Sequence, residues 1–152
     1  VGIKLPENFA APYLKPNLTQ FWSSWHMTLT QWIRSYFFNP FNRWMRGYRS
    51  IPAWTMILFG QVATMLIIGL WHGVTVNFIF WGLWHGLGLF IQNRWSDFAK
   101  TRFNLENPRL KSALNIGGIM LTFHFVALGW VFFALSSPSL SITVLGKMFG
   151  LP

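Results

Sequence analysis

Apolar residues recur every three to four positions between residues 18 and 37, as they do on one face of a helix. The residues in this rhythm are Leu18, Phe21, Trp22, Trp25, Leu29, Trp32, Ile33 and Tyr36. Polar residues fill the opposite face, and several of the apolar positions are tryptophans. A helix with this composition typically lies in the plane of a membrane interface. The pattern therefore predicts an interfacial amphipathic helix over 18–37, with Asn17 as its N-cap.

Three long apolar runs follow, over residues 52–72, 75–92 and 112–135. A helix of about 20 residues, rising 1.5 Å per residue, is long enough to cross the hydrocarbon core of a bilayer. Gly73, directly after His72, marks the break between the first two runs. We therefore predict an all-α fragment of a polytopic membrane protein, with one interfacial helix and about three transmembrane helices.

The two ends of the chain lack this regularity. Residues 1–17 contain three prolines and predict an irregular lead-in. Residues 136–152 begin with serine and proline, become apolar again, and are expected to form a tail. The first residues include no initiator Met and no apolar stretch typical of a signal peptide. We interpret residues 1–152 as the C-terminal part of a single membrane domain in a longer protein.

Composition and charge support a membrane protein. Only 10% of the residues are charged and 53% are hydrophobic, whereas about a quarter are charged in an ordinary soluble domain. The net charge of +9 comes from basic residues beside the apolar runs, mainly in 34–49 and 94–111. This placement predicts topology rather than a nucleic-acid partner, with both basic segments in the cytoplasm. His26 is then expected near the cytoplasmic face, and the His72–Gly73 break on the opposite side or in a cavity opening from it.

The histidines are the candidate chemical groups. No charged residue stands between Ser50 and Asn93, yet this stretch contains the pentapeptide Gly-Leu-Trp-His-Gly twice, around His72 and His85. Ionisable residues inside a membrane are functional candidates by default, because an unpaired polar group there costs several kcal/mol. At a helix break, a neutral imidazole of His72 can act as a general base, or it can simply donate to a backbone carbonyl. Packing is the favoured explanation for His85, and an interhelical hydrogen bond for His124.

Other functions remain open on these residues alone. Imidazole is a common axial ligand of haem, which makes a haem-binding membrane protein one alternative. A histidine proton relay in a transporter or channel segment is another, although transporters usually show broken helices in two paired repeats. No cysteine is present and no carboxylate lies near the histidines in the sequence, so we expect no metal site.

Several motifs resemble those of the membrane-bound O-acyltransferase family. The family's F-W-x-x-W-H-x-S-L-S-x-W segment is similar to Phe21–Trp32, and its later G-W-x-x-F segment is similar to Gly129–Phe133. Between them, Gly69–Gly73 and Trp81–Gly86 look like the family's histidine signature. The lead-in Pro6-Glu7-Asn8-Phe9 and Pro12-Tyr13 also fits. The chain looks most like the bacterial branch that includes alginate O-acetyltransferases and teichoic-acid D-alanyl transferases.

This resemblance implies an activity and a place in the cell. His72 would be the catalytic histidine, and His26 the second active-site residue, which is His in this branch and Asn in many eukaryotic members. A cytoplasmic acyl-CoA or acyl-carrier thioester would enter one end of a tunnel as donor substrate, with no further cofactor. A hydroxyl of an extracytoplasmic polysaccharide or cell-envelope polymer would enter the other end. The protein would be a multi-pass protein of the bacterial inner membrane, with an extracytoplasmic acyl-transfer protein as a candidate partner.

Five further residues are candidates for substrate binding: Trp25, Arg34, Trp71, Gly73 and Asn77. Arg34 belongs to a basic cluster that could hold an anionic donor such as a phosphate-bearing thioester. Gly73 lets a substrate approach the backbone closely.

The sequence departs from the family pattern at a few positions. The family usually has basic residues at the positions of Ser23 and Ser24, and often Asp at that of Ser35. It also often has Arg where Ala134 follows the G-W-x-x-F segment. These departures bear on how the donor is recognised at the cytoplasmic mouth.

Overall fold

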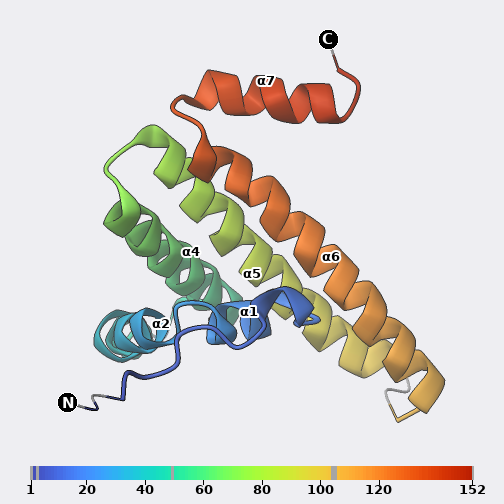
Figure 1. Cartoon of the computed structure of the whole chain (residues 1–152). Helices are drawn as coiled ribbons and strands as arrows, with labels where there is room; N and C mark the ends of the chain where they lie inside the picture. Colours follow the sequence, from blue (N-terminus) through green and yellow to red (C-terminus); the bar gives the residue numbers. More distant parts are fainter. Residues whose placement is uncertain (1, 3, 49, 104–105, 152) are drawn as a thin grey trace.

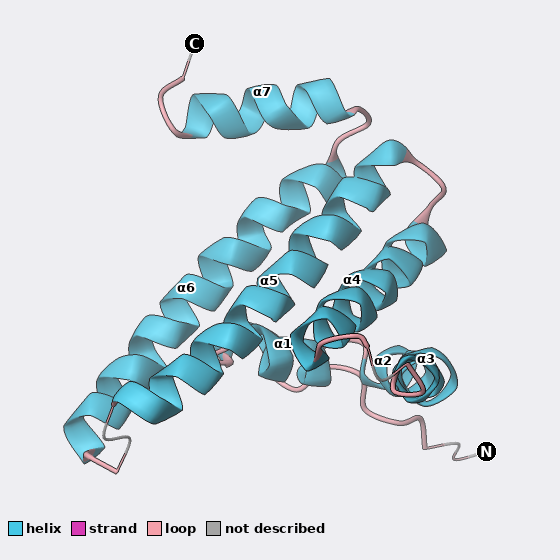
Figure 2. Ribbon diagram, turned by 180° about the vertical axis from the view of Figure 1, so that it is seen from behind, coloured by secondary structure: helices cyan, strands magenta, loops and turns pink. Residues whose placement is uncertain are grey.

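The computed structural model describes residues 2, 4–48, 50–103 and 106–151, and the prediction of an all-α chain is confirmed within them (Figures 1 and 2). Apart from one isolated backbone bridge between Phe9 and Trp25, the regular structure in the described ranges is helical. In chain order the elements are η1 (Pro12–Leu14), α1 (Leu18–Ser24), α2 (Met27–Ile33), the π-helical η2 (Arg34–Phe38), α3 (Asn39–Met45), α4 (Ala53–His72), α5 (Val76–Arg102), α6 (Pro108–Ala134) and α7 (Pro138–Met148).

Three long helices, α4, α5 and α6, lie side by side and form the body of the molecule, with α5 in the middle (Figures 1 and 2). Glycines allow α4 and α5 to approach closely. A Cβ on Gly82 would lie 2.8 Å from the Met65 carbonyl oxygen, and one on Gly86 would lie 2.7 Å from Val62 Cα. Small residues at such positions let two membrane helices pack closely.

Two of the three expected spans have the length and composition of membrane helices. Among the described helices, α4 and α6 meet both conditions, with mean hydropathy of 1.8 and 1.9. The expected middle span, 75–92, forms the first part of α5, where Asn77, His85 and several glycines and tryptophans lower the hydropathy.

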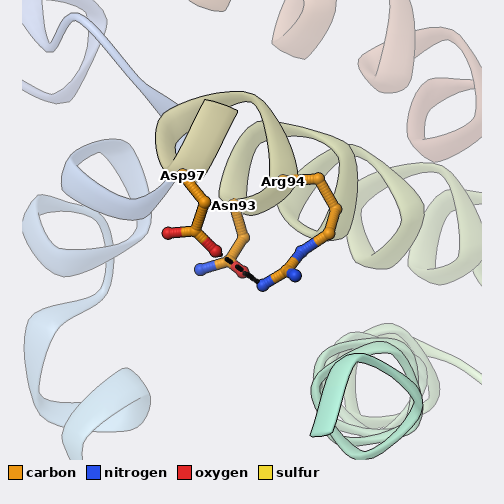
Figure 3. A network of polar contacts seen from close by, with 3 residues as sticks. All are labelled: Asn93, Arg94 and Asp97. Carbon is orange, nitrogen blue, oxygen red and sulfur yellow. Dashed lines mark hydrogen bonds and ion pairs between the residues drawn. The ribbon is translucent and has the colours of Figure 1, made fainter. Parts of the chain in front are cut away.

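Helix α5 continues ten residues beyond its expected end at Gln92, to Arg102. Arg94 donates to Asn93 Oδ1 at 2.7 Å and pairs with Asp97 at 2.8 Å, one turn further along the helix (Figure 3). Charge pairs three positions apart stabilise a helix by a few tenths of a kcal/mol each. The basic segment 94–111, which lies beyond the expected span, therefore begins as helix.

The prediction of one continuous helix over 18–37 is wrong. Helix α1 ends at Ser24, α2 begins at Met27, and between them His26 has a left-handed backbone with φ of 45°. The cause lies in the lead-in, whose backbone pairs with the break. Ala10 N–H donates to the Ser24 carbonyl, and Met27 N–H donates to the Asn8 carbonyl, both at 3.0 Å. These bonds engage backbone groups that a continuous helix would use for itself.

The chain changes direction at His26, so α1 and the run from α2 to α3 pass the long helices in opposite directions. Trp22 of α1 packs against His85 of α5, with 5.1 Å between ring centroids. His26, at the turn, lies 6.5 Å from His72 at the end of α4. The chain then returns along α4, because a Cβ on Gly60 would lie 2.9 Å from Asn42 Oδ1 of α3. His26 is therefore beside the His72–Gly73 break. The expectation that the break lies on the side opposite His26 is wrong, and its alternative, a cavity opening from that side, stays a prediction.

The expected tail contains a helix. Ser137 caps α7 by accepting a hydrogen bond from Leu140 N–H at 3.3 Å, and α7 crosses the ends of α5 and α6 (Figure 1). Asn77, at the start of α5, joins α5 to the α6–α7 junction and to α7 by hydrogen bonds. Its Nδ2 donates to the Leu135 carbonyl at 2.6 Å and lies 3.4 Å from the hydroxyl of the buried Ser141.

Candidate functional site

An open cleft of about 390 Å³ lies where the lead-in, the α1–α2 turn, the end of α4 and the end of α6 meet. We call it the histidine cleft. Its lining residues are Tyr13, Trp25, His26, His72, Trp130 and Phe133. The cleft therefore brings together the two histidines that the sequence predicted as catalytic.

His72 is the last residue of α4, and Gly73 follows it as the C-cap. Aromatic rings surround its imidazole, including those of Trp71, Trp81 and Phe133, at centroid distances of 4.8, 5.8 and 4.9 Å. The hydrogen bonds found among the described residues include none to this imidazole. Aromatic packing thus orients the ring, and its nitrogens have no hydrogen-bond partner among the described residues.

His26 is oriented mainly by its backbone. The Thr28 N–H and hydroxyl both donate to Asn8 Oδ1, at 3.1 and 2.7 Å, and the Thr30 hydroxyl donates to the Trp25 carbonyl at 3.1 Å. These bonds hold the left-handed turn from both sides. The imidazole itself contacts Phe9, 4.9 Å away between centroids, and makes no hydrogen bond to the described part of the chain.

Trp25, Trp71 and Gly73, three of the predicted substrate-binding residues, are close to the two histidines. Trp25 lines the cleft. The ring centroid of Trp71 lies 6.5 Å from that of His26, and Trp71 is 60% exposed. A Cβ on Gly73 would lie 2.5 Å from the Phe78 ring, so the hinge has no room for a side chain there. Asn77 lies outside the histidine cleft, where it is 3% exposed and bonded to the α6–α7 junction.

Arg34 lines a second, smaller cleft of about 160 Å³, which we call the arginine cleft. Its lining residues are Thr19, Trp22, Ser23, Thr30, Arg34, Phe38, Gln61, Thr64, Met65, Ile68 and Leu89. Trp22 Nε1 and Gln61 Oε1 are buried without a hydrogen-bond partner in the described structure. Gln61 and His72 lie on one face of α4, about 16 Å apart along the helix axis at 1.5 Å per residue. The two clefts therefore lie along the same helix face.

The other two histidines are outside both clefts. His85 is fully buried between Trp22, Trp81 and Phe125, and both of its nitrogens are without a partner among the described residues. His124 Nδ1 lies 2.7 Å from the Met120 carbonyl of its own helix, so its hydrogen bond does not join two helices. The part of the chain that the structure describes contains no group of three His, Cys, Asp or Glu side chains placed to hold a metal.

Sequence reasoning missed the other three residues that line the histidine cleft. Tyr13 stands in the proline-rich lead-in, while Trp130 and Phe133 stand in Gly129–Phe133 on α6. All three belong to motifs that carried the family resemblance. That resemblance was the available signal, because their spacing along the chain does not show that they meet.

Comparison with known proteins identifies relatives of this chain. The model of MBOAT, the membrane-bound O-acyltransferase family, matches residues 2–137. The chain is 33% identical to a peptidoglycan O-acetyltransferase of Helicobacter pylori, over 99% of this chain and 26% of that protein. It is 33% identical to a teichoic acid D-alanyltransferase of Bacillus subtilis, over 88% of this chain and 33% of that protein. It is also 33% identical to a probable alginate O-acetylase of Pseudomonas syringae, over 99% of this chain and 25% of that protein.

The chain spans between a quarter and a third of the length of these curated relatives. The matched range of the family model, residues 2–137, contains the positions of both cleft histidines and of the α6 motif. Helices α4 and α6 are also apolar enough for a membrane protein. On the extent of the family match and the identity to these relatives, this chain belongs to the membrane-bound O-acyltransferase family.

Proposed function

We propose that the protein carrying this chain is a membrane-embedded O-acyltransferase. It moves an acyl group, acetyl in our proposal, from a cytoplasmic thioester to a hydroxyl of an extracytoplasmic polysaccharide or other cell-envelope acceptor. The observation that carries the proposal is the pair of imidazoles in the histidine cleft, 6.5 Å apart and free of protein hydrogen bonds in the described structure. A general base and a polarising group for one acyl transfer need this kind of proximity.

In the proposed reaction, His72 removes the proton from the acceptor hydroxyl as its oxygen attacks the thioester carbonyl carbon. The carbonyl oxygen takes up the electron pair and becomes an oxyanion. When this intermediate collapses, the C–S bond breaks, and His72 gives the proton that it took from the acceptor hydroxyl to the leaving thiolate. His26, on the facing side of the cleft, orients and polarises the thioester. Proton transfer by a positioned base typically contributes ~10²–10⁴-fold to the rate.

The arginine cleft is our proposed donor side. Arg34 provides a fixed positive charge for a phosphate of the donor, and guanidinium groups bind phosphates through paired hydrogen bonds. Trp22 Nε1 and Gln61 Oε1, which lack partners in the described structure, offer a hydrogen-bond donor and an acceptor to polar groups of the same donor molecule. The shared face of α4 leads from this cleft toward His72. A thioester whose phosphate is held at Arg34 would then extend toward the histidines.

The relatives support the choice of chemistry and location. Their names specify O-acetyltransfer to peptidoglycan, D-alanyl transfer to teichoic acid and alginate O-acetylation, all in bacteria. We therefore place the protein in the bacterial inner membrane as a multi-pass protein. An extracytoplasmic acyl-transfer partner that receives the acyl group is part of the same proposal.

The test is acyl transfer by the purified intact protein in detergent or nanodiscs, with an acetyl thioester and an oligosaccharide acceptor. His72→Ala is expected to abolish transfer while thermal stability and donor binding stay near wild type. His26→Ala should lower the rate but leave some activity, because it removes orientation and not the base. His124→Ala is the matched control, since that exposed histidine bonds only within α6. Near-wild-type turnover by His72→Ala would refute the proposal.

A further inference from the structure

The proposed reaction, on which this inference rests, places negative charge on the thioester carbonyl oxygen. Acyl transferases stabilise such an oxyanion with hydrogen-bond donors fixed before the reaction begins. His26 is one donor facing the histidine cleft. We propose that Tyr13 is a second catalytic residue, whose hydroxyl donates a hydrogen bond to the oxyanion, and that Trp130 is its positioning residue.

The direction of one hydrogen bond leaves the Tyr13 proton available. Trp130 Nε1 lies 3.0 Å from the Tyr13 hydroxyl oxygen. An indole N–H can only donate, so the tyrosine oxygen must be the acceptor. The hydroxyl proton then points to some other acceptor, and no described residue accepts it. The bond from Trp130 also strengthens the hydroxyl as a donor, because hydrogen bonds in a chain polarise one another.

The ring that carries this hydroxyl is fixed in place. Tyr13 makes edge-on contacts with Phe21, Trp25 and Phe123, at centroid distances of 5.7, 5.9 and 5.8 Å. The backbone is also constrained, because Ala11 is left-handed, with φ of 48°, directly before the short helix η1. A donor held this way loses little entropy and needs little reorganisation when charge develops.

Tyr13 also lies in the cleft that contains the two proposed catalytic histidines. It lines the histidine cleft together with His26 and His72, and it remains 36% exposed, so a ligand in the cleft can reach it. Trp25 separates it from His26 on one side, and Trp130 and Phe133 separate it from His72 on the other. All three side chains nevertheless line the same cleft, so a thioester carbonyl bound there lies between the tyrosine and the histidines.

The step balances with the groups already named. As the acceptor oxygen bonds to the carbonyl carbon, His72 holds the acceptor's proton and the carbonyl oxygen holds the electron pair. The Tyr13 O–H donates a hydrogen bond to that oxygen and keeps its proton throughout. When the C–S bond breaks, the carbonyl re-forms and the hydrogen bond weakens again. Because the bond is strongest in the transition state, it should raise kcat and leave KM nearly unchanged.

The experiment measures kcat and KM for the intact protein with an acetyl thioester and an oligosaccharide acceptor. Tyr13→Phe removes the hydroxyl and keeps the ring. It should lower kcat by ~10²–10³-fold, the loss typical of one oxyanion donor, with both KM values unchanged. Tyr36→Phe removes the same atom from an exposed tyrosine outside both clefts and should have no effect.

Trp130→Phe is the second variant, and it also decides the case if Tyr13→Phe does not fold. It keeps the Tyr13 hydroxyl but removes the N–H that orients it, so we expect kcat to fall by roughly 10-fold with unchanged KM. In a Tyr13→Phe background the same change should have no further effect on kcat. A purely structural bond would instead lower the melting temperature and raise KM without this dependence.

Two outcomes overturn the inference. The first is a kcat within threefold of wild type in Tyr13→Phe, or in Trp130→Phe if only that variant folds. The second is a loss of kcat fully explained by a smaller folded fraction. His72→Ala is measured in parallel to separate the two proposals. If His72→Ala is inactive and Tyr13→Phe is normal, only the role of Tyr13 fails, whereas an active His72→Ala removes the proposed function itself.

Discussion

His85 illustrates how a polar side chain can serve a membrane protein without touching a substrate. Its ring lies 4.8 Å from Trp81 and 5.1 Å from Trp22. Gly129 of α6 lies against the same imidazole, since a Cβ there would be 2.7 Å from His85 Nε2. Its contacts with Trp22 and Phe125 are T-shaped, with interplanar angles of 89° and 83°. The residue therefore joins α1, α5 and α6.

We expect His85→Ala to reduce stability much more than turnover. Deleting a large buried side chain typically costs about 2–5 kcal/mol, because a cavity remains. The measurement compares the melting temperature in detergent with the kcat of the folded fraction, for His85→Ala and the exposed control His124→Ala. A large loss of kcat at an unchanged melting temperature would contradict the packing role.

The two cleft histidines differ in how far sequence reasoning could reach them. His72 stands at a break marked by Gly73 in an uncharged stretch, so helix length and glycine chemistry pointed to it. His26 stood in what looked like the middle of a regular helix, and only the family resemblance singled it out. Tyr13 could not be found from periodicity, because its place depends on contacts with α6, far along the chain.

At the scale of elements, a seam of glycines sets how closely α4 and α5 approach. Gly69 of α4 and the C-cap Gly73 face Phe78. Gly82 and Gly86 of α5 face the backbone of α4. This seam keeps the His72–Gly73 hinge short and His72 at a fixed height beside the α1–α2 turn. Close packing between helices is a main source of association in a membrane, where apolar burial alone gives little.

Two glycines offer a matched test of this seam. Gly82→Ala would place a Cβ 2.8 Å from the Met65 carbonyl oxygen, so the helices must separate, at a cost of about 1–3 kcal/mol. Gly117→Ala on α6 meets no atom within 4 Å and should be neutral or stabilising by up to about 1 kcal/mol, since alanine favours helix. Thermal unfolding of the two variants gives the comparison. Equal melting temperatures would show that the seam is not a tight contact.

The break between α1 and α2 was beyond sequence reasoning for a physical reason. Both helices present apolar residues to the long helices, so the apolar rhythm continues through the break as if one helix were present. What ends α1 is Asn8 and Ala10, which pair with Met27 and Ser24 from outside the segment. Local propensity cannot reveal a hydrogen bond made by a different part of the chain.

The whole molecule has two ends of different character. Helices α4 and α5 are antiparallel, so the basic connector before α4 and the basic end of α5 lie at one end (Figure 1). The short α4–α5 loop, with the α6–α7 junction close to it, is at the other end (Figure 1). If α4 crosses the membrane, α1 and α2 enter from the basic side and turn back at His26. Irregular backbone at membrane depth is tolerated where protein surrounds it or where it lines a cavity.

Cysteine labelling tests the resulting topology. This chain contains no cysteine, so single cysteines can be introduced at Arg46, Lys100 and Val74 in an otherwise cysteine-free intact protein. Positive charges favour the cytoplasm, so an impermeant maleimide should reach Arg46→Cys and Lys100→Cys only after the membrane is opened. Val74→Cys, in the α4–α5 loop, should react in intact cells. Labelling of both basic positions from outside would reverse the orientation.

The left-handed backbone at His26 has a consequence for which residues evolution can place there. Most amino acids with a Cβ are strained at a φ of 45°, whereas Asn, Asp and His tolerate it best. The resemblance to the family implies His at this position in one branch and Asn in many members of another. Backbone strain would then remove most substitutions at this position before the chemistry of the new side chain has any effect. The backbone conformation would exclude a β-branched residue whatever the chemistry of its side chain. The turn therefore limits the residue types that can occupy position 26.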